Sequence, residues 1–313
     1  MVHSEPKIVV RRILVPLDDS ELAATVVPYV ASIAKRFRSR CVLYHVLESR
    51  PRWKRGALPP LVDGPPAENI QEYLDRVAQK LSEHGIEADT LIERGEPASM
   101  ILKAAQVQKA DLVAVATHGH GGIGPWLFGT VAHRVVERAN STLLLVRPSS
   151  AAPTVGAVQL RRLLIPVDGS QEGEAALPWA REFVRRCEAT LHLLQIVPTL
   201  ESLPGTRATA AALSPAMVGE FLIAASDAAQ AYLQRLSAKL RKEKVTCEVA
   251  VLRGEPADEI IEYAAQAGID LTFMATHGRL GFGGAWYGSV VNKVLSRFTS
   301  PLILVRAPGK HEE

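Results

Sequence analysis

The sequence predicts two tandem α/β domains, each a doubly wound, five-stranded parallel sheet with helices on both faces. The first observation is an internal repeat, because three landmarks of the first half return in the same order in the second half. Such a repeat indicates two copies of a whole domain rather than a short solenoid unit. The second observation is that nearly continuous apolar runs alternate with helical stretches, which is typical of strands buried on both faces. The paired landmarks are RRILVPLDDS (11–20) with RRLLIPVDGS (161–170), ERGEPA (93–98) with LRGEPA (252–257), and ATHGHGGIGPWLFGT (116–130) with ATHGRLGFGGAWYGS (275–289).

Chain length agrees with this division. The 313 residues exceed the usual size of a domain with a single core. The stretch PSSAAPTVGAVQ (148–159) is rich in Pro, Ser, Ala and Gly and lacks apolar periodicity. We therefore predict domains at 1–148 and 161–313, joined by a linker at 149–160.

Composition narrows the classes of partner. The net charge of +3 is a small imbalance between 36 basic and 33 acidic side chains, so it does not predict a nucleic-acid partner. Cys41, Cys187 and Cys247 lie far apart without metal-ligand spacing, which indicates reduced thiols. The N-terminus lacks a signal-peptide pattern, and no apolar run reaches the ~18 residues that cross a bilayer. We expect a cytoplasmic protein without a membrane partner.

Both halves show the same order of predicted elements. In the first half, ILVPL (13–17) is a predicted strand, and Ser20 is the predicted N-cap of an amphipathic helix through Phe37. Pro16 and Pro166 suit only the carboxyl end of a strand, where pairing stops. The other elements expected in the first half are strands at 41–47, 86–93, 111–117 and 142–146, helices over 70–81, from Pro97 and over 130–138, and a proline-rich loop at 50–66. In the second half, strands are expected near 163–167, 191–197, 245–252, 271–275 and 302–305.

This order of elements predicts where a ligand binds. In an open parallel sheet, ligands bind beyond the carboxyl ends of the strands, where the strand order reverses. The first strand of each copy leads to Asp18 or Asp168, and the fourth leads to Thr117 or Thr276. If these two strands are neighbours, the aspartate and the glycine-rich segment face one crevice.

The glycine-rich segments are suited to phosphate. A loop that leads from a strand into a helix offers unpaired N–H groups and the positive end of the helix dipole. Glycine lets the main chain approach an anion closely. Gly129-Thr130 and Gly288-Ser289 stand at the predicted helix starts, although a flexible loop that ends in a capped helix is the alternative. The GxGxxG match at 119–124 is not kept in the second copy, so we do not interpret it as a dinucleotide fingerprint.

The repeated pattern resembles a universal stress protein domain. The resemblance rests on ILVPLD with a following Ser, then THG, nine residues, Gly-Thr or Gly-Ser, and a closing LLLV strand. It covers about 13–148 and 163–308. The ATP-binding members of this family carry Gly-x-x-Gly, nine residues, then Gly-Ser or Gly-Thr. Here Ala116 and Ala275 stand in place of the first glycine.

The resemblance implies a Rossmann-like, adenine-nucleotide-binding fold with ATP as the ligand, accompanied by Mg²⁺ or Mn²⁺. It further implies that the two domains associate through their last strands as an internal pseudo-dimer, with a homodimer as a further level of assembly. An unknown protein partner would read the occupancy of the site in a stress response.

The resemblance also implies roles for individual residues. Asp18 and Asp168 would lie against ribose or phosphate, with helix capping as the alternative role. Val46 and Ile196 would pack beside adenine, with a plain core position as the alternative. The full set of implied nucleotide-binding residues is Pro16, Leu17, Asp18, Val46, Ala116, Thr117, His118, Gly119, Gly129, Thr130 and Val131 in the first copy, and Pro166, Val167, Asp168, Ile196, Ala275, Thr276, His277, Gly278, Arg279, Gly288, Ser289 and Val290 in the second.

Other polar residues give weaker signals. His118 and His277 lack a carboxylate partner at ligand spacing, so a backbone-bonded loop histidine is favoured over a catalytic or metal role. Arg279 either contacts phosphate or is solvated. The basic cluster at 50–55 has no counterpart in the second copy, and we interpret it as a solvated loop.

The sequence therefore favours an ATP-binding stress protein that is non-catalytic or hydrolyses ATP very slowly. No general base, paired metal carboxylates or activated nucleophile is evident in the sequence. Two alternatives remain open: a slow ATPase or nucleotidyl-transfer enzyme on the same fold, and a nucleotide-free interaction module.

Overall fold

The computed structural model describes residues 8–48, 67–117, 129–148, 153–197, 199, 215–276 and 289–307. The chain divides into two compact units, Val9–Val158 and Gln159–Glu313, which we call domain 1 and domain 2. Each contains five described strands that pair in parallel throughout.

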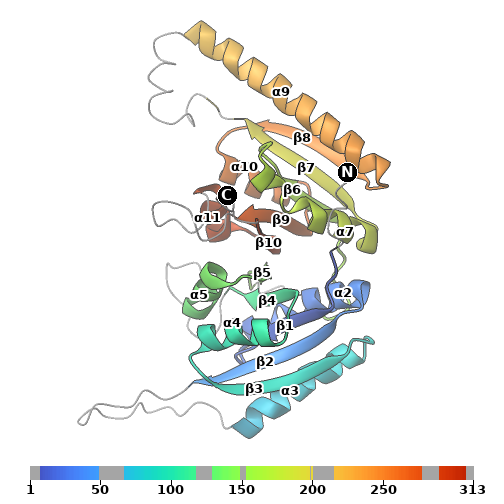
Figure 1. The fold of residues 1–313 in the computed structure, drawn as a ribbon, viewed down its shortest axis with the longest axis vertical. Helices are drawn as coiled ribbons and strands as arrows, with labels where there is room; N and C mark the ends of the chain where they lie inside the picture. The colour runs from blue at the N-terminus through green and yellow to red at the C-terminus, as the bar shows by residue number, and fades with distance from the viewer. Residues whose placement is uncertain are drawn as a thin grey trace, which may run out of the picture. The chain divides into compact units, whose positions relative to one another are not determined.

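Domain 1 has the strand order β3-β2-β1-β4-β5, so the order reverses between β1 and β4 (Figure 1). Right-handed crossovers place α2 and α3 on one face of this sheet and α4 and α5 on the other. In agreement, α4 packs against α5, and α3 packs against β2 and β3. The elements are β1 (Arg12–Pro16), α1 (Glu21–Ala24), α2 (Val27–Phe37), β2 (Arg40–Glu48), α3 (Ala67–Ser82), β3 (Ala88–Gly95), α4 (Pro97–Val107), β4 (Leu112–Ala116), α5 (Thr130–Arg138) and β5 (Thr142–Val146).

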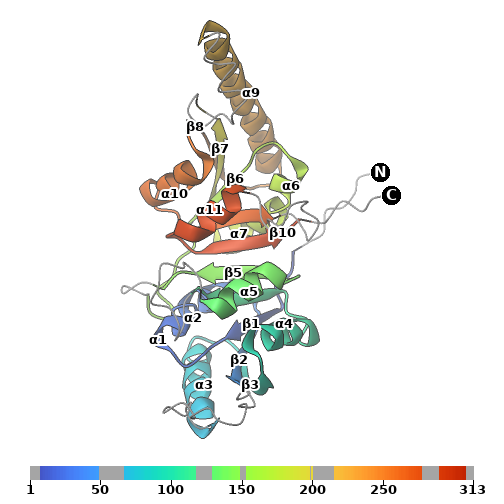
Figure 2. The same ribbon diagram turned by 90° about the vertical axis from the view of Figure 1, so that its left-hand side faces the viewer.

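Domain 2 repeats this arrangement with the strand order β10-β9-β6-β7-β8. Its α9 is much longer than its counterpart α3 and runs along β7 and β8, as Figures 1 and 2 show. The elements are β6 (Arg162–Pro166), α6 (Gln171–Glu174), α7 (Leu177–Cys187), β7 (Thr190–Val197), α9 (Pro215–Lys242), β8 (Cys247–Arg253), α10 (Pro256–Gln266), β9 (Leu271–Thr276), α11 (Ser289–Arg297) and β10 (Leu302–Arg306).

The expected single helix from Ser20 to Phe37 is wrong, because the structure has two helices there. Ser20 caps α1, which ends at Ala24, and α2 begins at Val27 with Pro28 in its first turn. Proline has no N–H to donate, and its ring clashes with the carbonyl group four residues earlier. A helix therefore restarts at this position, where proline is tolerated.

The third strand also begins later than expected, at Ala88 instead of Ile86. The N–H of Ile86 donates to the carbonyl of Leu81 at 3.1 Å, and Gly85 has a φ of 73°. This geometry is the usual left-handed termination of a helix. Ile86 is buried and closes the end of α3, and the strand follows it.

The strands and inward helix faces form the apolar core of each domain. The largest fully buried side chains include Tyr44 in domain 1 and the edge-to-face pair Phe183 and Phe273 in domain 2, whose ring centroids are 5.1 Å apart. The three cysteines are buried free thiols, as the sequence predicts. Within the described ranges, no helix has both the length and the apolar character required to span a bilayer.

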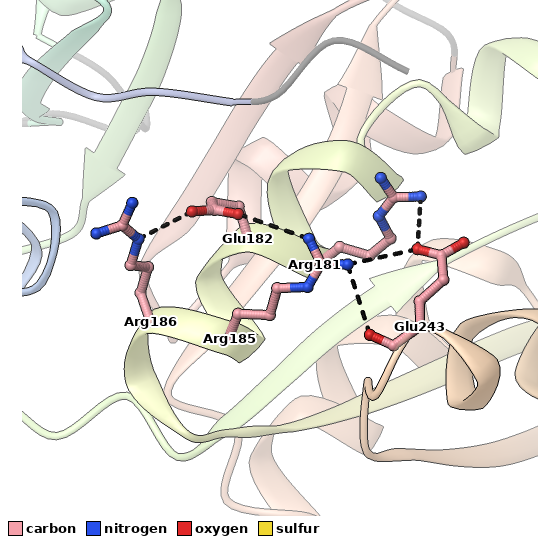
Figure 3. A network of polar contacts seen from close by, with 5 residues as sticks. All are labelled: Arg181, Glu182, Arg185, Arg186 and Glu243. Carbon is pink, nitrogen blue, oxygen red and sulfur yellow. Dashed lines mark hydrogen bonds and ion pairs between the residues drawn. The ribbon is translucent and has the colours of Figure 1, made fainter. Parts of the chain in front are cut away.

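A polar network holds the end of α9 against α7 in domain 2 (Figure 3). Glu182 is buried on α7 and pairs with Arg186 at 2.8 Å and with Arg185 at 3.8 Å. Glu243, which follows α9, pairs with Arg181 at 3.0 Å and with Arg185 at 3.6 Å. Arg185 thus joins the two carboxylates and fixes α9 against α7.

Candidate functional site

The crevice predicted for domain 1 belongs at the carboxyl ends of β1 and β4. These strands pair directly, with Ile13 opposite Leu112. Asp18 follows β1 after Pro16 and Leu17. The N–H of Gly129 donates to the carbonyl of Thr117, at the end of β4, at 2.7 Å. Asp18 and Gly129 therefore lie at the same edge of the sheet, at the point where the strand order reverses.

Domain 2 has the same geometry in its described part. Strand β6 pairs with β9, with Leu163 opposite Leu271, so Asp168 and Thr276 follow neighbouring strands. Ser289 begins α11. Thr276 is buried, and its hydroxyl has no hydrogen-bond partner within the described residues.

Each aspartate makes a structural contact, which bears on the choice between a ligand-binding and a helix-capping role. One carboxylate oxygen of Asp18 accepts hydrogen bonds from the N–H and hydroxyl of Ser20, at 3.2 and 2.6 Å. The Ser20 hydroxyl oxygen accepts from the N–H of Ala23 and so caps α1. Asp168 and Ser170 make the corresponding contacts in domain 2. The aspartates thus orient the capping serines rather than cap the helices themselves.

The residue after each aspartate adopts a left-handed conformation. Asp19 has a φ of 62° and Gly169 a φ of 82°. Glycine adopts this conformation without steric cost, and Asp is among the few other residues that tolerate it. The two domains therefore form the same turn with different residues.

Helix α5 begins without a side-chain cap from its own N-cap residue. Gly129 is its N-cap and has no side chain to accept a hydrogen bond, and its first turn holds no acidic residue. The first N–H groups of a helix carry the positive end of the dipole and are suited to anions. Thr130 is exposed and Val131 is half-buried at this helix start.

The apolar positions of the predicted site lie on the second strand of each domain. Val46 and Ile196 are both half-buried, unlike the fully buried residues earlier in β2 and β7. Each can therefore offer an apolar surface to a flat ring. The neighbouring His45 is buried, and its Nδ1 lies 2.7 Å from the carbonyl oxygen of Leu17, which fixes the turn into Asp18.

The remaining predicted residues divide into two sets. Pro16 and Pro166 end their strands as expected, and the N–H of Leu17 and of Val167 each donates one further bond to the neighbouring strand. The structure also describes Ala116 and Ala275, near the ends of β4 and β9, and Val290, in the first turn of α11. Outside the described residues lie His118, Gly119, His277, Gly278, Arg279, Gly288, the other residues of 118–128 and 277–288, and the basic cluster at 50–55.

The repeated RGEPA motif has a structural role. Glu96 accepts from the N–H groups of Ala98 and Ser99 at the start of α4, and also pairs with Arg134 of α5 at 3.0 Å. Hydrogen bonds from Ser99 and Ala98, together with that from Arg134, hold the pKa of Glu96 below its ordinary value. Glu255 and Lys293 form the same clamp in domain 2. The motif therefore ties the helix after the glycine-rich segment to its neighbour.

Two tyrosines beside the aspartates were missed by the sequence reasoning. Tyr73 on α3 lies near Asp18 and Asp19, and burial together with these charges raises its pKa to about 12. Tyr232 on α9 donates a 2.6 Å hydrogen bond to Glu174 at the end of α6. The two tyrosines are 159 residues apart (232 − 73), the same offset as the RGEPA and THG landmarks, and this offset could have revealed them.

The opposite edge of domain 2 holds a polar hollow of about 520 Å³, lined by residues including Arg162, His192 and Tyr263. His192 Nδ1 lies 3.0 Å from the Tyr263 hydroxyl, and burial lowers the pKa of His192. Arg162 and His192 lie near the amino ends of β6 and β7, opposite the carboxyl ends that lead to Asp168, and Tyr263 lies on α10. Among the residues that the structure describes, no group of three or more His, Cys, Asp or Glu could hold a metal ion.

Comparison with known proteins matches both halves of the chain to one family, described as the universal stress protein family, at residues 10–147 and 159–306. A universal stress protein of Mycolicibacterium smegmatis is 26% identical over 302 residues, covering 94% of this chain and 96% of that protein. The crystal structure of a universal stress protein from Archaeoglobus fulgidus has 19% identity, covers 96% of this chain and 97% of that one, and has a TM-score of 0.68. A shorter solved structure, a universal stress protein from Archaeoglobus fulgidus in complex with dAMP, has 19% identity and a TM-score of 0.34, and covers 44% of this chain and 98% of that one.

Proposed function

Because the chain belongs to the universal stress protein family, with one family domain in each half, we propose that it binds adenine nucleotides in the crevice of each domain. ATP is the proposed ligand, with Mg²⁺ or Mn²⁺ as a counterion on its phosphates. The protein binds this ligand without turnover or with very slow hydrolysis, and occupancy of the crevice changes its affinity for a protein partner in a stress response.

One observation carries this proposal: Asp18 and the uncapped start of α5 lie at the carboxyl ends of neighbouring strands where the strand order reverses. The first N–H groups of α5 suit an anionic phosphate chain. Asp18 suits a group that donates hydrogen bonds, such as a sugar hydroxyl or an exocyclic amine. The half-buried Val46 adds an apolar surface for a base. A nucleotide presents these three kinds of group in one molecule.

The test begins with the purified chain. It is denatured, and any released nucleotide is identified by its mass; the refolded or ligand-free chain is then titrated with ATP by calorimetry. We expect saturable binding, and a loss of binding in domain 1 on Gly129→Val, because the added side chain obstructs the approach of phosphate to the N–H groups of α5. Gly288→Val is the corresponding variant of domain 2.

The matched control is Gly219→Val, since Gly219 lies exposed on α9 with open space around it. Binding should be unchanged in this variant. A chain that releases no nucleotide and gives neither heat nor thermal shift with ATP would refute the proposal and favour a nucleotide-free interaction module. Hydrolysis above background that is lost in Gly129→Val or Gly288→Val would instead favour a slow ATPase.

A further inference from the structure

The two predicted sites differ in the hydrogen bonding of the tyrosine near each aspartate. In domain 2, Tyr232 donates its hydroxyl hydrogen to Glu174 at 2.6 Å. In domain 1, the hydroxyl of Tyr73 is buried and has no hydrogen-bond partner within the described residues. Tyr73 and Tyr232 occupy equivalent positions in the repeat, so the two copies differ in whether this tyrosine hydroxyl has a hydrogen-bond acceptor.

A single sequence difference accounts for the contrast. Glu174 stands 150 residues after Ala24, the same offset that relates Asp18 to Asp168. Ala24 has no polar side-chain atom and cannot accept a hydrogen bond. Domain 1 therefore has the phenol of the pair without its carboxylate acceptor.

A buried hydroxyl without a partner loses the hydrogen bonds that it makes with water, and it gains no bond in exchange. Tyr73 is equivalent to Tyr232, whose hydroxyl reaches Glu174 at the end of α6, so the hydroxyl of Tyr73 faces the corresponding end of α1. The charges of Asp18 and Asp19 act on it there. A group that enters the crevice can supply the missing partner in domain 1. In domain 2, the same group would have to compete with Glu174 for the hydroxyl of Tyr232.

The chemistry around Tyr73 also indicates which part of a ligand it meets. Two carboxylates close to the hydroxyl repel a phosphate, since like charges in a partly buried setting disfavour each other. A hydroxyl group can both accept from Tyr73 and donate to a carboxylate, and the polar edge of adenine offers the same two functions. The nucleoside part of a nucleotide fits this position, and the phosphates fit the start of α5.

We propose that the two sites are not equivalent: the hydroxyl of Tyr73 bonds the nucleoside part of the ligand in domain 1, whereas Glu174 occupies the hydroxyl of Tyr232 and weakens the site in domain 2. This inference rests on the proposed nucleotide binding. It assigns the higher affinity to domain 1 and makes Tyr73 a specificity-determining residue for the nucleoside.

The test is calorimetric titration of the full chain with ATP and, separately, with adenosine. The wild type should show two binding events of different affinity for ATP. Tyr73→Phe should weaken the tighter event by about three- to tenfold, the loss expected for one neutral hydrogen bond. The factor should be the same for adenosine as for ATP. Tyr232→Phe, the matched control, should leave the tighter event unchanged, and thermal unfolding checks that both variants are folded.

A second variant adds an acceptor instead of removing a donor. Ala24→Glu should reproduce the arrangement of domain 2 and weaken the tighter event while leaving Tyr73 in place. Two equal binding events in the wild type, or unchanged affinity in Tyr73→Phe, would overturn the inference and leave the proposed function standing. A penalty seen with ATP and absent with adenosine would place Tyr73 on the phosphates and also overturn it. A wild type that binds neither ligand would refute the proposed function as well.

Discussion

The carboxylate of Asp18 accepts a 2.6 Å hydrogen bond from the hydroxyl of Ser20, and that hydroxyl caps α1. The aspartate therefore has a structural task in addition to its proposed contact with a ligand. The two tasks can be separated, because asparagine keeps the accepting oxygen and loses the charge.

We expect Asp18→Asn to leave the free energy of unfolding nearly unchanged and to weaken ATP binding in domain 1 about tenfold, since the hydrogen bond from the ligand loses its charged acceptor. Ser20→Ala should lower the free energy of unfolding by about 1 kcal/mol through loss of the cap, and should keep the affinity. Chemical denaturation and calorimetry measure the two effects. Equal losses of affinity in both variants would show that Asp18 acts only through the turn.

The clamp between Glu96 and Arg134 predicts a pH dependence of stability. The pKa of Glu96 is lowered in the folded state, mainly by its hydrogen bonds with Ser99. Its stabilisation is therefore fully present above the ordinary glutamate pKa and is lost as the pH falls through the lower, folded-state value. Glu96→Gln should cost less than about 1 kcal/mol at neutral pH, because both side chains are about half exposed.

The difference in unfolding free energy between wild type and Glu96→Gln should shrink as the pH falls below about 4.3, the ordinary glutamate value. Urea unfolding at a series of pH values measures it. Glu72→Gln, an exposed change on α3, is the control and should show no such trend. A difference that stays constant down to strongly acidic pH would contradict the role given to the clamp.

The network around Glu182 should contribute to the stability of domain 2 (Figure 3). Glu182→Gln keeps the shape of the side chain and removes the charge that faces Arg185 and Arg186. Since both arginines are partly exposed and remain hydrated, we expect a loss of about 1–2 kcal/mol, below the cost of breaking a fully buried pair. Glu220→Gln on the exposed surface of α9 should change nothing measurable. Equal unfolding midpoints for the two variants would argue against the network.

The left-handed turn at Gly169 predicts opposite effects for two glycine substitutions. A side chain at Gly169 would meet no atom within 4 Å, so Gly169→Ala tests the backbone conformation alone and should cost about 1 kcal/mol. Gly219→Ala, in an exposed helical position, should instead stabilise by about 0.5–1 kcal/mol. Gly169→Asp should be tolerated better than Gly169→Ala because Asp19 holds the same turn in domain 1. Denaturant unfolding would contradict this interpretation if Gly169→Ala proved stabilising.

Much of the fold could be predicted from periodicity and from the repeat. The predicted strand at 142–146 and the helix at 130–138 match β5 and α5, because their apolar patterns and ends are unambiguous. The break at Thr25 and Val26 was missed because the amphipathic pattern continues through it, and Pro28 alone marks it. The placement of Ile86 was missed because an apolar residue that closes a helix looks the same as one that begins a strand.

The place of the candidate site in the fold could be predicted from the sequence, whereas its side-chain contacts could be predicted only in part. The edge that holds Asp18 and Gly129 follows from the order of elements. The contacts of Tyr73, Tyr232 and Glu174 depend on how α3, α9 and α6 approach that edge, and no local pattern encodes this approach. The nucleotide-binding roles of the predicted residues and the association of the domains through their last strands stay predictions.

Helices α1 and α6 have only four residues each. A helix of this length is not stable by itself. Each therefore depends on its capping serine and on the aspartate that accepts a hydrogen bond from that serine. The amide hydrogens of Ala23 and Gly173, which those serines hold, will exchange with solvent whenever the turn opens. The amide resonances of Ala23 and Gly173 thus report separately on each half of the intact chain. Each lies in the turn that follows Asp18 or Asp168, so each can report whether a ligand occupies the proposed site of its own domain.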